Sequence, residues 1–168
     1  MLNDAKGNID TIQNKVNLGI VNLTDGCSCS ESIMVTYGQE FGLTREIALR
    51  IASGFGGGMG LMGETCGAVT AAFMIIGLKF GASSIEDAFA RENTYELVAE
   101  FARRFKSIRG SITCRELLGG LGGLGGLDLS SPEGRKYIRE SGLTPQIVAD
   151  VIRILEEMFY ENCASISL

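Results

Sequence analysis

The sequence predicts an all-α fold, and three observations carry this prediction. Apolar residues recur at three- and four-residue steps along most of the chain, which is the spacing of an amphipathic helix. No stretch shows the strict alternation of apolar and polar residues that a half-buried strand requires. Several periodic segments also follow a hydroxyl residue that can cap a helix. Because 168 residues with 45% hydrophobic content can bury one core, we expect a single helical domain over residues 1–168.

The first half of the chain contains four helical patterns. Amphipathic spacing is found over residues 1–22, 29–41 and 44–55, and Thr44 supplies a cap for the third of these helices. The fourth helix begins at Cys66, and this cysteine shares one apolar stripe with Val69, Phe73, Ile76 and Phe80. Cys66 is therefore expected to begin a helix that faces the core.

The second half contains two long amphipathic patterns and two helix starts. The apolar positions are Val98, Phe101, Phe105 and Ile108 in one pattern, and Ile147, Val151, Ile154 and Met158 in the other. Ser131 and Thr144 each stand directly before a proline. A hydroxyl cap followed by proline in the first turn is typical of a helix start, so we expect helices to begin at both positions.

Two glycine-rich segments interrupt the helices. Residues 54–63 hold six glycines in ten positions, and residues 119–126 alternate glycine pairs with leucine. Glycine loses the most backbone freedom on folding, and the first segment leads into Cys66. We therefore expect its backbone to approach a cluster or ligand closely, through Gly56, Gly57, Gly58 and Gly63. The second segment is expected to be flexible. Neither is a dinucleotide fingerprint, because no strand precedes them.

Composition excludes several classes of function. The chain has no histidine, the usual general base and the commonest ligand of zinc and haem iron. A net charge of -5 and a pI near 4.8 argue against nucleic-acid binding, which needs a positive surface. The longest apolar run, residues 67–78, is shorter than a membrane span, and residues 1–6 lack the pattern of a secretory signal. We expect a cytoplasmic protein, and a mean hydropathy of +0.19 favours a homodimer that covers apolar surface.

The five cysteines, at positions 27, 29, 66, 114 and 163, are too few and too dispersed for a secreted disulfide scaffold. In a reducing cytosol they would be thiols, metal ligands or transient disulfides. No two of them have the two-residue spacing of thioredoxin-like motifs or zinc ribbons. A site that uses several cysteines must therefore be assembled by the fold from distant segments.

Three cysteines are candidates for chemistry. Cys66 is the first, because it follows a glycine-rich segment and a helix amino terminus stabilises a thiolate. Cys29 also heads an apolar stripe, which permits either a second thiolate at a helix start or packing in the core. Cys114 precedes Arg115, whose guanidinium either lowers the pKa of this thiol or pairs with Glu116.

Three further residues have weaker cases. Glu64 either relays protons to the Cys66 thiol or only complements the helix dipole. Cys27 is two residues from Cys29 and could form a disulfide with it only through a strained ring. Cys163 is expected to be a spectator thiol.

The cysteine segments closely resemble those of the C_GCAxxG_C_C family of redox-active proteins over roughly residues 20–160. The resemblance is carried by Gly26–Ile33, Ala52–Gly60, Gly63–Ala71 and Cys114–Leu118. It implies a small bacterial or archaeal protein with redox or cluster chemistry. The same motif occurs in split-Soret cytochromes, which carry c-type haem. Covalent haem is not expected here, because the chain has neither Cys-x-x-Cys-His nor any histidine.

By motif position, the family's first three cysteines fall on Cys29, Cys66 and Cys114. The fourth does not match, because Thr144 stands at its place before a proline. The small residue that closes the central motif is Ala71 instead of glycine. A cluster with four thiolates would therefore need a further ligand, whereas three cysteines suffice for a disulfide and a resolving thiol.

We expect the helices to bring Cys29, Cys66 and Cys114 to one pocket under the first glycine-rich segment. The leading function is thiol–disulfide exchange or electron transfer with an unidentified redox partner, in which Cys66 is the low-pKa thiolate and Cys29 or Cys114 its partner. One alternative is a module that binds an iron–sulfur cluster or another soft metal through the same cysteines. Another is a helical protein that binds a partner and whose cysteines only pack.

Overall fold

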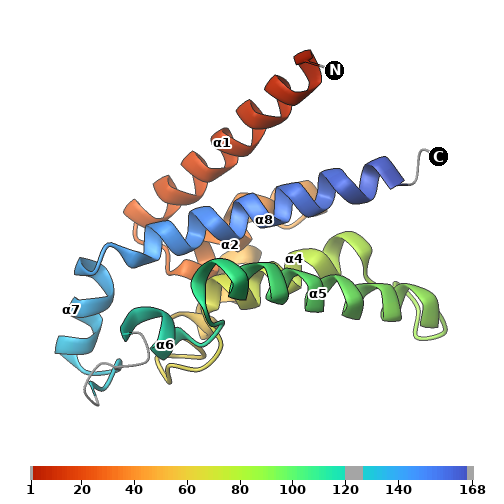
Figure 1. Cartoon of the computed structure of the whole chain (residues 1–168). Coiled ribbons are helices and arrows are strands. Elements are labelled where there is room, and N and C mark those ends of the chain that lie inside the picture. The colour runs from red at the N-terminus through yellow and green to blue at the C-terminus, as the bar shows by residue number, and fades with distance from the viewer. Residues whose placement is uncertain (1, 120–126, 166–168) are drawn as a thin grey trace.

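The structure is a computed structural model that describes residues 2–119 and 127–165, and within them the side chains of residues 9–119 and 127–162. The described residues form helices joined by loops, with one isolated β-bridge (Figure 1). The α-helices are α1 (Leu2–Thr24), α2 (Cys29–Gly38), α3 (Arg45–Ala52), α4 (Gly67–Phe80), α5 (Ala88–Arg109), α6 (Cys114–Gly119), α7 (Pro132–Glu140) and α8 (Leu143–Ser165). Two 3-10 helices, η1 (Gln39–Phe41) and η2 (Ser53–Phe55), extend α2 and α3. The all-α prediction is confirmed.

Helix α2 lies at the centre of the core, where it packs against α1, α3, α4 and α8. Its Ile33 and Tyr37 are fully buried. The Ser30 and Ser32 hydroxyls on the same helix are also buried, and both are satisfied: Ser30 donates to the Ala52 carbonyl at 2.9 Å and Ser32 to the Gly19 carbonyl at 2.7 Å. Because a buried polar group without a partner is costly, these bonds fix α2 against α3 and α1.

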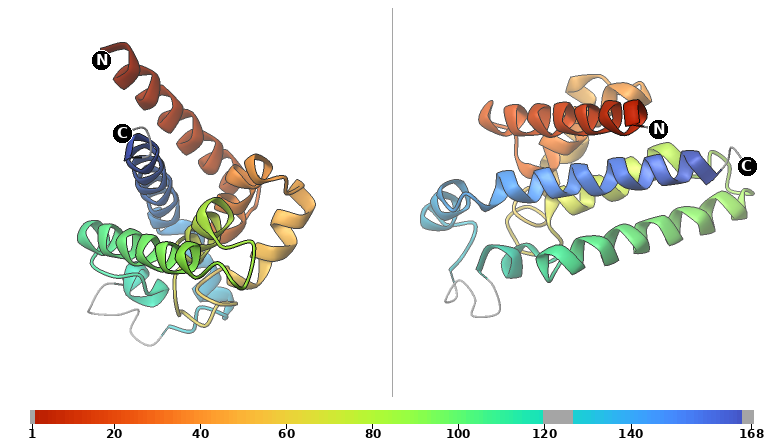
Figure 2. Two further views of the ribbon diagram at one scale, coloured as in Figure 1. Left: turned by 90° about the vertical axis from the view of Figure 1, so that its right-hand side faces the viewer. Right: turned by 45° about the horizontal axis from the view of Figure 1, so that its top comes forward.

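The long helices α1, α5 and α8 surround this centre. Helix α8 lies between α1 and α5, and α4 lies beside α5 (Figures 1 and 2). Among the described side chains of α1, Val16 is buried in the core. The amino-terminal end of α1 extends away from the other helices (Figure 1), and Ile9 is 64% exposed. The short helices α6 and α7 lie together at one end of the molecule (Figure 1). No described helix combines the length and the apolar character needed to cross a membrane.

Two of the three predicted hydroxyl caps are confirmed. Thr44 accepts the Ile47 N–H, and Ser131 accepts the Gly134 N–H directly before Pro132. The cap predicted at Thr144 is wrong, because α8 already begins at Leu143.

The hydroxyl at this start belongs to Ser141, which accepts the Leu143 N–H at 3.4 Å. Gly142 between them has a φ of +67°, which separates α7 from α8.

The prediction of flexibility for residues 119–126 falls almost entirely outside the described residues. Cys163 was predicted to be a spectator thiol, and its side chain also lies outside the described residues.

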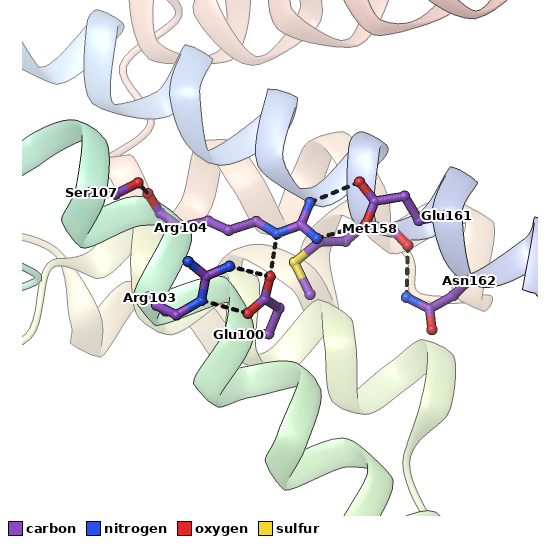
Figure 3. A network of polar contacts seen from close by, with 7 residues as sticks. All are labelled: Glu100, Arg103, Arg104, Ser107, Met158, Glu161 and Asn162. Atoms are coloured by element: carbon purple, nitrogen blue, oxygen red, sulfur yellow. Dashed lines mark hydrogen bonds and ion pairs between the residues drawn. The ribbon is translucent and has the colours of Figure 1, made fainter.

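A polar network joins α5 to α8 (Figure 3). Arg104 donates to Glu100 on its own helix at 2.6 Å, and to both carboxylate oxygens of Glu161 on α8 at 3.0 and 2.6 Å. Arg103 pairs with Glu100 alone, at 2.8 Å through each of two nitrogens. The hydrogen bonds from Arg103 and then Arg104 lower the pKa of Glu100 to about 2. Within this network, Arg104 is therefore the residue that connects the two helices, which are also joined by the ion pair between Arg109 and Asp150.

We expect Arg104→Ala to lower the free energy of unfolding by about 1 kcal/mol, the upper end for an exposed ion pair. Arg103→Ala is the matched control, because it removes the same charge from a 69% exposed side chain and should have a smaller effect on stability. Urea denaturation at neutral pH measures both. The contribution of Glu100 should be lost as the pH falls below its ordinary value of about 4.3 towards its native pKa. An equal loss in the two variants would mean that the ion pair between Arg104 and Glu161 adds nothing to stability.

Candidate functional site

A cavity of about 690 Å³ lies beside α6 and α7. Its wall includes the beginning of α2, the first glycine-rich segment, α6, α7 and the beginning of α8. Four cysteines line it: Cys27, Cys29, Cys66 and Cys114, all of them free thiols. Every cysteine with a described side chain therefore faces the same space, including the three that were expected to share a pocket.

Cys29 is the first residue of α2. Ser28 caps this helix in a capping box, in which the Ser28 hydroxyl accepts the Glu31 N–H and the Glu31 carboxylate accepts the Ser28 N–H at 2.7 Å. This local motif fixes where α2 begins and so places Cys29 at its amino end. There the aligned backbone dipoles favour a negative charge.

The Cys29 thiolate is stabilised by donors from three segments. The Cys66 thiol donates a hydrogen bond to Cys29, and the backbone N–H groups of Gly57, Ala68 and Ser30 also donate to its sulfur. The bond from Cys66 is the largest cause, and together these donors lower the pKa of Cys29 to about 7 against the opposing effect of burial. Among the described thiols, Cys29 is the one whose pKa is lowered.

Cys66 is the donor in this pair. It is the cap residue of α4 and is only 3% exposed. Its hydrogen bond to Cys29 raises the pKa of Cys66 well above the ordinary value, and burial raises it further. The expectation that Cys66 is the low-pKa thiolate is therefore reversed. The physical reason is first the hydrogen bond between the two thiols, which lowers the pKa of Cys29 and raises that of Cys66, and then the three backbone N–H groups that converge on Cys29.

A short backbone pairing brings Cys114 to Cys66. Thr65 and Thr113 form an isolated antiparallel bridge. The Cys66 N–H donates to the Ile112 carbonyl at 2.8 Å, and the Cys114 N–H donates to the Glu64 carbonyl at 2.7 Å. The residue that follows on each side of the bridge is thus a cysteine. This pairing was not predicted, because a single bridging pair is too short to produce a strand pattern.

The Cys114 thiol stays protonated near neutral pH. It is 6% exposed, and burial, followed by the nearby Cys29, raises its pKa to about 12. Arg115 opposes this shift only weakly. Its guanidinium donates to the carbonyls of Met62 and Leu127, while Glu116 accepts from the Ser111 hydroxyl. Arg115 therefore acts on the pKa of Cys114 in the expected direction, although burial outweighs it, and the alternative pairing with Glu116 is not among its described contacts.

The first glycine-rich segment folds into a left-handed turn over the thiols. Residues 57–61 all have φ between +57° and +72°, including Met59 and Leu61. This region is costly for residues with a Cβ atom, about 1–2 kcal/mol each, and glycine at the other three positions avoids the cost. The Gly57 N–H is thereby directed to Cys29. The backbone lies so close to Cys114 that a Cβ atom on Gly58 would be 2.6 Å from the Cys114 Cβ.

The predicted binding positions divide into two groups. Gly56 and Gly57 line the cavity, whereas Gly58 and Gly63 do not and instead allow close packing. A Cβ atom on Gly63 would lie 2.8 Å from the Arg115 guanidinium. The Glu64 side chain is exposed and forms no hydrogen bond with a thiol in the described part of the chain, so its contribution to the site is the carbonyl that accepts from Cys114.

Sequence reasoning gave too little weight to two residues that line the cavity. Cys27 has its Sγ atom 3.9 Å from the Arg45 guanidinium, and burial raises the pKa of this thiol. Thr144 lies in the wall as well, although its expected role as a helix cap is wrong. The position where the resemblance expects a fourth cysteine thus faces the same space as the other three.

The described residues do not fit a metal centre. Among residues with described side chains, no three His, Cys, Asp or Glu side chains are grouped closely enough to hold a metal ion. Cys29, Cys66 and Cys114 share a cavity wall, and among them the Cys66 thiol is the hydrogen-bond partner of Cys29. The geometry therefore favours a thiol pair over a cluster with three thiolates.

Comparison with known proteins also indicates a family that is defined by its cysteines. A family model described as "Putative redox-active protein (C_GCAxxG_C_C)" matches residues 27–158. This range contains Cys27, Cys29, Cys66 and Cys114, the whole glycine-rich turn and most of α8. No curated protein and no solved structure matches the chain.

Proposed function

Because the chain belongs to the C_GCAxxG_C_C family of putative redox-active proteins, we propose that it acts by thiol–disulfide exchange through Cys29 and Cys66. One observation carries this proposal. The sulfur of Cys29 receives hydrogen bonds from three backbone N–H groups and from the Cys66 thiol, at the wall of a cavity. A stabilised thiolate next to a second thiol is the arrangement that exchange requires.

The reaction has two steps. The Cys29 thiolate attacks one sulfur of a substrate disulfide, which forms a mixed disulfide and releases the other half as a thiolate. Cys66 then attacks the Cys29 sulfur, its proton passes to the released thiolate, and the second half leaves as a thiolate. The substrate disulfide gains two electrons and becomes one thiol and one thiolate, while Cys29 and Cys66 lose two electrons and become a disulfide.

Exposure supports this order of roles. All three cysteines line the cavity, and Cys29 is partly exposed as a residue whereas Cys66 and Cys114 are buried. The raised pKa of Cys66 suits a resolving thiol that keeps its proton until the mixed disulfide has formed. Cys114, with a pKa of about 12, is assigned no part in the first attack.

The pH dependence of alkylation at Cys29 tests the proposal. We expect the rate of iodoacetamide reaction at this residue to rise through a midpoint near pH 7, since the thiolate fraction grows as the pH passes the pKa. An ordinary thiol has its midpoint near pH 8.5. Quenched samples analysed by peptide mass mapping separate Cys29 from the other cysteines.

The midpoint is a sharper readout than a single rate. At pH 7 a thiol with a pKa of about 7 is roughly sixteen times more ionised than an ordinary one, but its thiolate is about fivefold less nucleophilic. The net advantage is only about threefold. Cys66→Ala is the matched variant, because it removes the largest cause of the shift and should move the midpoint to higher pH. A midpoint at or above pH 8.5 in the unsubstituted protein would overturn the proposal.

A further inference from the structure

We propose that the substrate of the thiol pair is a small organic disulfide that carries an acidic group, held by Arg139 and Arg135 of α7. This inference rests on the thiol–disulfide function proposed above and adds the chemical class of the substrate. It follows from the size of the cavity, the apolar character of its wall and the position of the two arginines.

The cavity has the size and lining of a small-molecule site. Its volume of about 690 Å³ falls within the roughly 300–1,000 Å³ of typical ligand pockets. Besides the thiols, much of its wall is aliphatic: Ile20, Leu23, Leu61, Leu117, Leu118, Ile138 and Ile147. Such a wall favours a compact molecule with an apolar body.

The charged side chains of the wall favour an anion. Arg135 and Arg139 are four residues apart on α7, which places them on one face of that helix, and both line the cavity. Arg139 has no ion pair or hydrogen bond among the described residues, whereas Arg135 donates to the Ser130 carbonyl at 2.9 Å. Glu31 is the one acidic residue in the described wall, and its carboxylate already accepts the Ser28 N–H. A chain with a net charge of -5 thus presents a positive wall beside its thiols.

These guanidinium groups have a chemical use in the exchange reaction. A carboxylate on the substrate would be repelled by the Cys29 thiolate unless a positive charge lay nearby. Arginine is suited to this task, since its planar group binds a carboxylate through two hydrogen bonds. The same charges would stabilise the thiolates that leave in both steps.

Two aromatic disulfides test the inference. 5,5′-Dithiobis(2-nitrobenzoate) carries two carboxylates, and 4,4′-dithiodipyridine is neutral near pH 7. The measurement is the second-order rate constant of each reagent with the reduced protein, for the unsubstituted chain and for Arg139→Gln, Arg135→Gln and both together. Lys136→Gln is the control, because it removes a positive charge from the same helix at a residue that does not line the cavity.

We expect Arg139→Gln to lower the rate with the anionic disulfide by about fivefold, the range of an exposed ion pair, and the double variant by tenfold or more. The rate with the neutral disulfide should change by less than about twofold, which also verifies that each variant retains its folded site. Added salt should slow the anionic reagent more in the unsubstituted protein than in the double variant.

The outcomes separate this inference from the function on which it rests. An equal effect of Lys136→Gln, or equal effects on both reagents, would overturn the role of the arginines while leaving thiol exchange intact. Failure of the neutral reagent to react at Cys29 would instead overturn the proposed function, and the substrate class with it.

Discussion

Replacement of Cys29 by serine is expected to slow the reaction with 4,4′-dithiodipyridine by at least about threefold at neutral pH, the net advantage of a thiol with a pKa near 7 over an ordinary thiol. Only the thiolate attacks a disulfide, and the other described thiols all have a raised pKa: Cys27, Cys66 and Cys114. Cys114, with a pKa of about 12, is ionised to roughly one part in 100,000 at pH 7. Removal of Cys29 therefore leaves only thiols of raised pKa in the described cavity wall.

Cys66→Ser is expected to give a different defect. Cys29 still attacks the disulfide, but the mixed disulfide cannot be resolved and should persist. Mass spectrometry of the intact protein would find one half of the reagent attached, and peptide mapping would place it on Cys29. In the unsubstituted protein the same treatment should leave a disulfide between Cys29 and Cys66.

Cys114→Ser serves as the control for these two variants. It replaces a buried thiol in the same cavity that is assigned no part in the attack, so it should retain the first step. Urea denaturation of all three variants then distinguishes a site from packing. A loss of stability without any loss of reactivity in Cys29→Ser would support the interpretation that the cysteines only pack, and would contradict the assigned roles.

The helices could be predicted because their signal is local. The apolar stripe that follows Cys66 was sufficient to predict α4, and the cap at Thr44 was sufficient to predict the start of α3. The cap expected at Thr144 failed because a second hydroxyl, Ser141, stands three residues earlier with Gly142 after it. Propensity alone cannot decide which of two hydroxyl residues three positions apart marks the start of a helix.

The roles within the site could not be predicted, because they depend on contacts between distant segments. Cys29 and Cys66 both lie at helix starts, and the sequence favoured Cys66 on account of the glycines before it. The structure reverses this order, since the Gly57 and Ala68 N–H groups both donate to Cys29. A local signal for Cys29 was nevertheless present. Ser28 and Glu31 have the spacing of a capping box, which fixes the start of α2 at this cysteine.

The position of Cys114 next to Cys66 could not be predicted from the sequence pattern either. The motif resemblance assigned this residue to the same site as Cys66, but no periodicity indicates how the two segments meet. They meet through the bridge between Thr65 and Thr113 and through hydrogen bonds on both sides of it. Backbone pairing of this length carries almost no sequence pattern. The family resemblance therefore indicates which cysteines belong to the site, and the fold shows how their segments meet.

Gly67→Ala is expected to disrupt the thiol pair and the fold together. Gly67 is the first residue of α4, and a methyl group there would lie 2.5 Å from the Phe55 carbonyl oxygen and 2.9 Å from the Cys29 sulfur. The carbonyl belongs to the backbone and cannot rotate away. Relief of these contacts must therefore move either the glycine-rich turn or Cys29. We expect a loss of about 1–3 kcal/mol in the free energy of unfolding, which is typical of overpacking.

Gly77→Ala is the matched control, because it introduces the same methyl group in the same helix at a position with no atom within 4 Å. Alanine there should raise stability by about 0.5–1 kcal/mol through its higher helix propensity. The two substitutions thus have opposite predicted signs, and urea denaturation measures both. The second readout is the pH midpoint of alkylation at Cys29, which should shift to higher pH in Gly67→Ala because displacement of the sulfur weakens its hydrogen bonds to Gly57 and Ala68. Equal stability and an unchanged midpoint in the two variants would mean that the close approach of α4 to Cys29 does not create the low-pKa thiol.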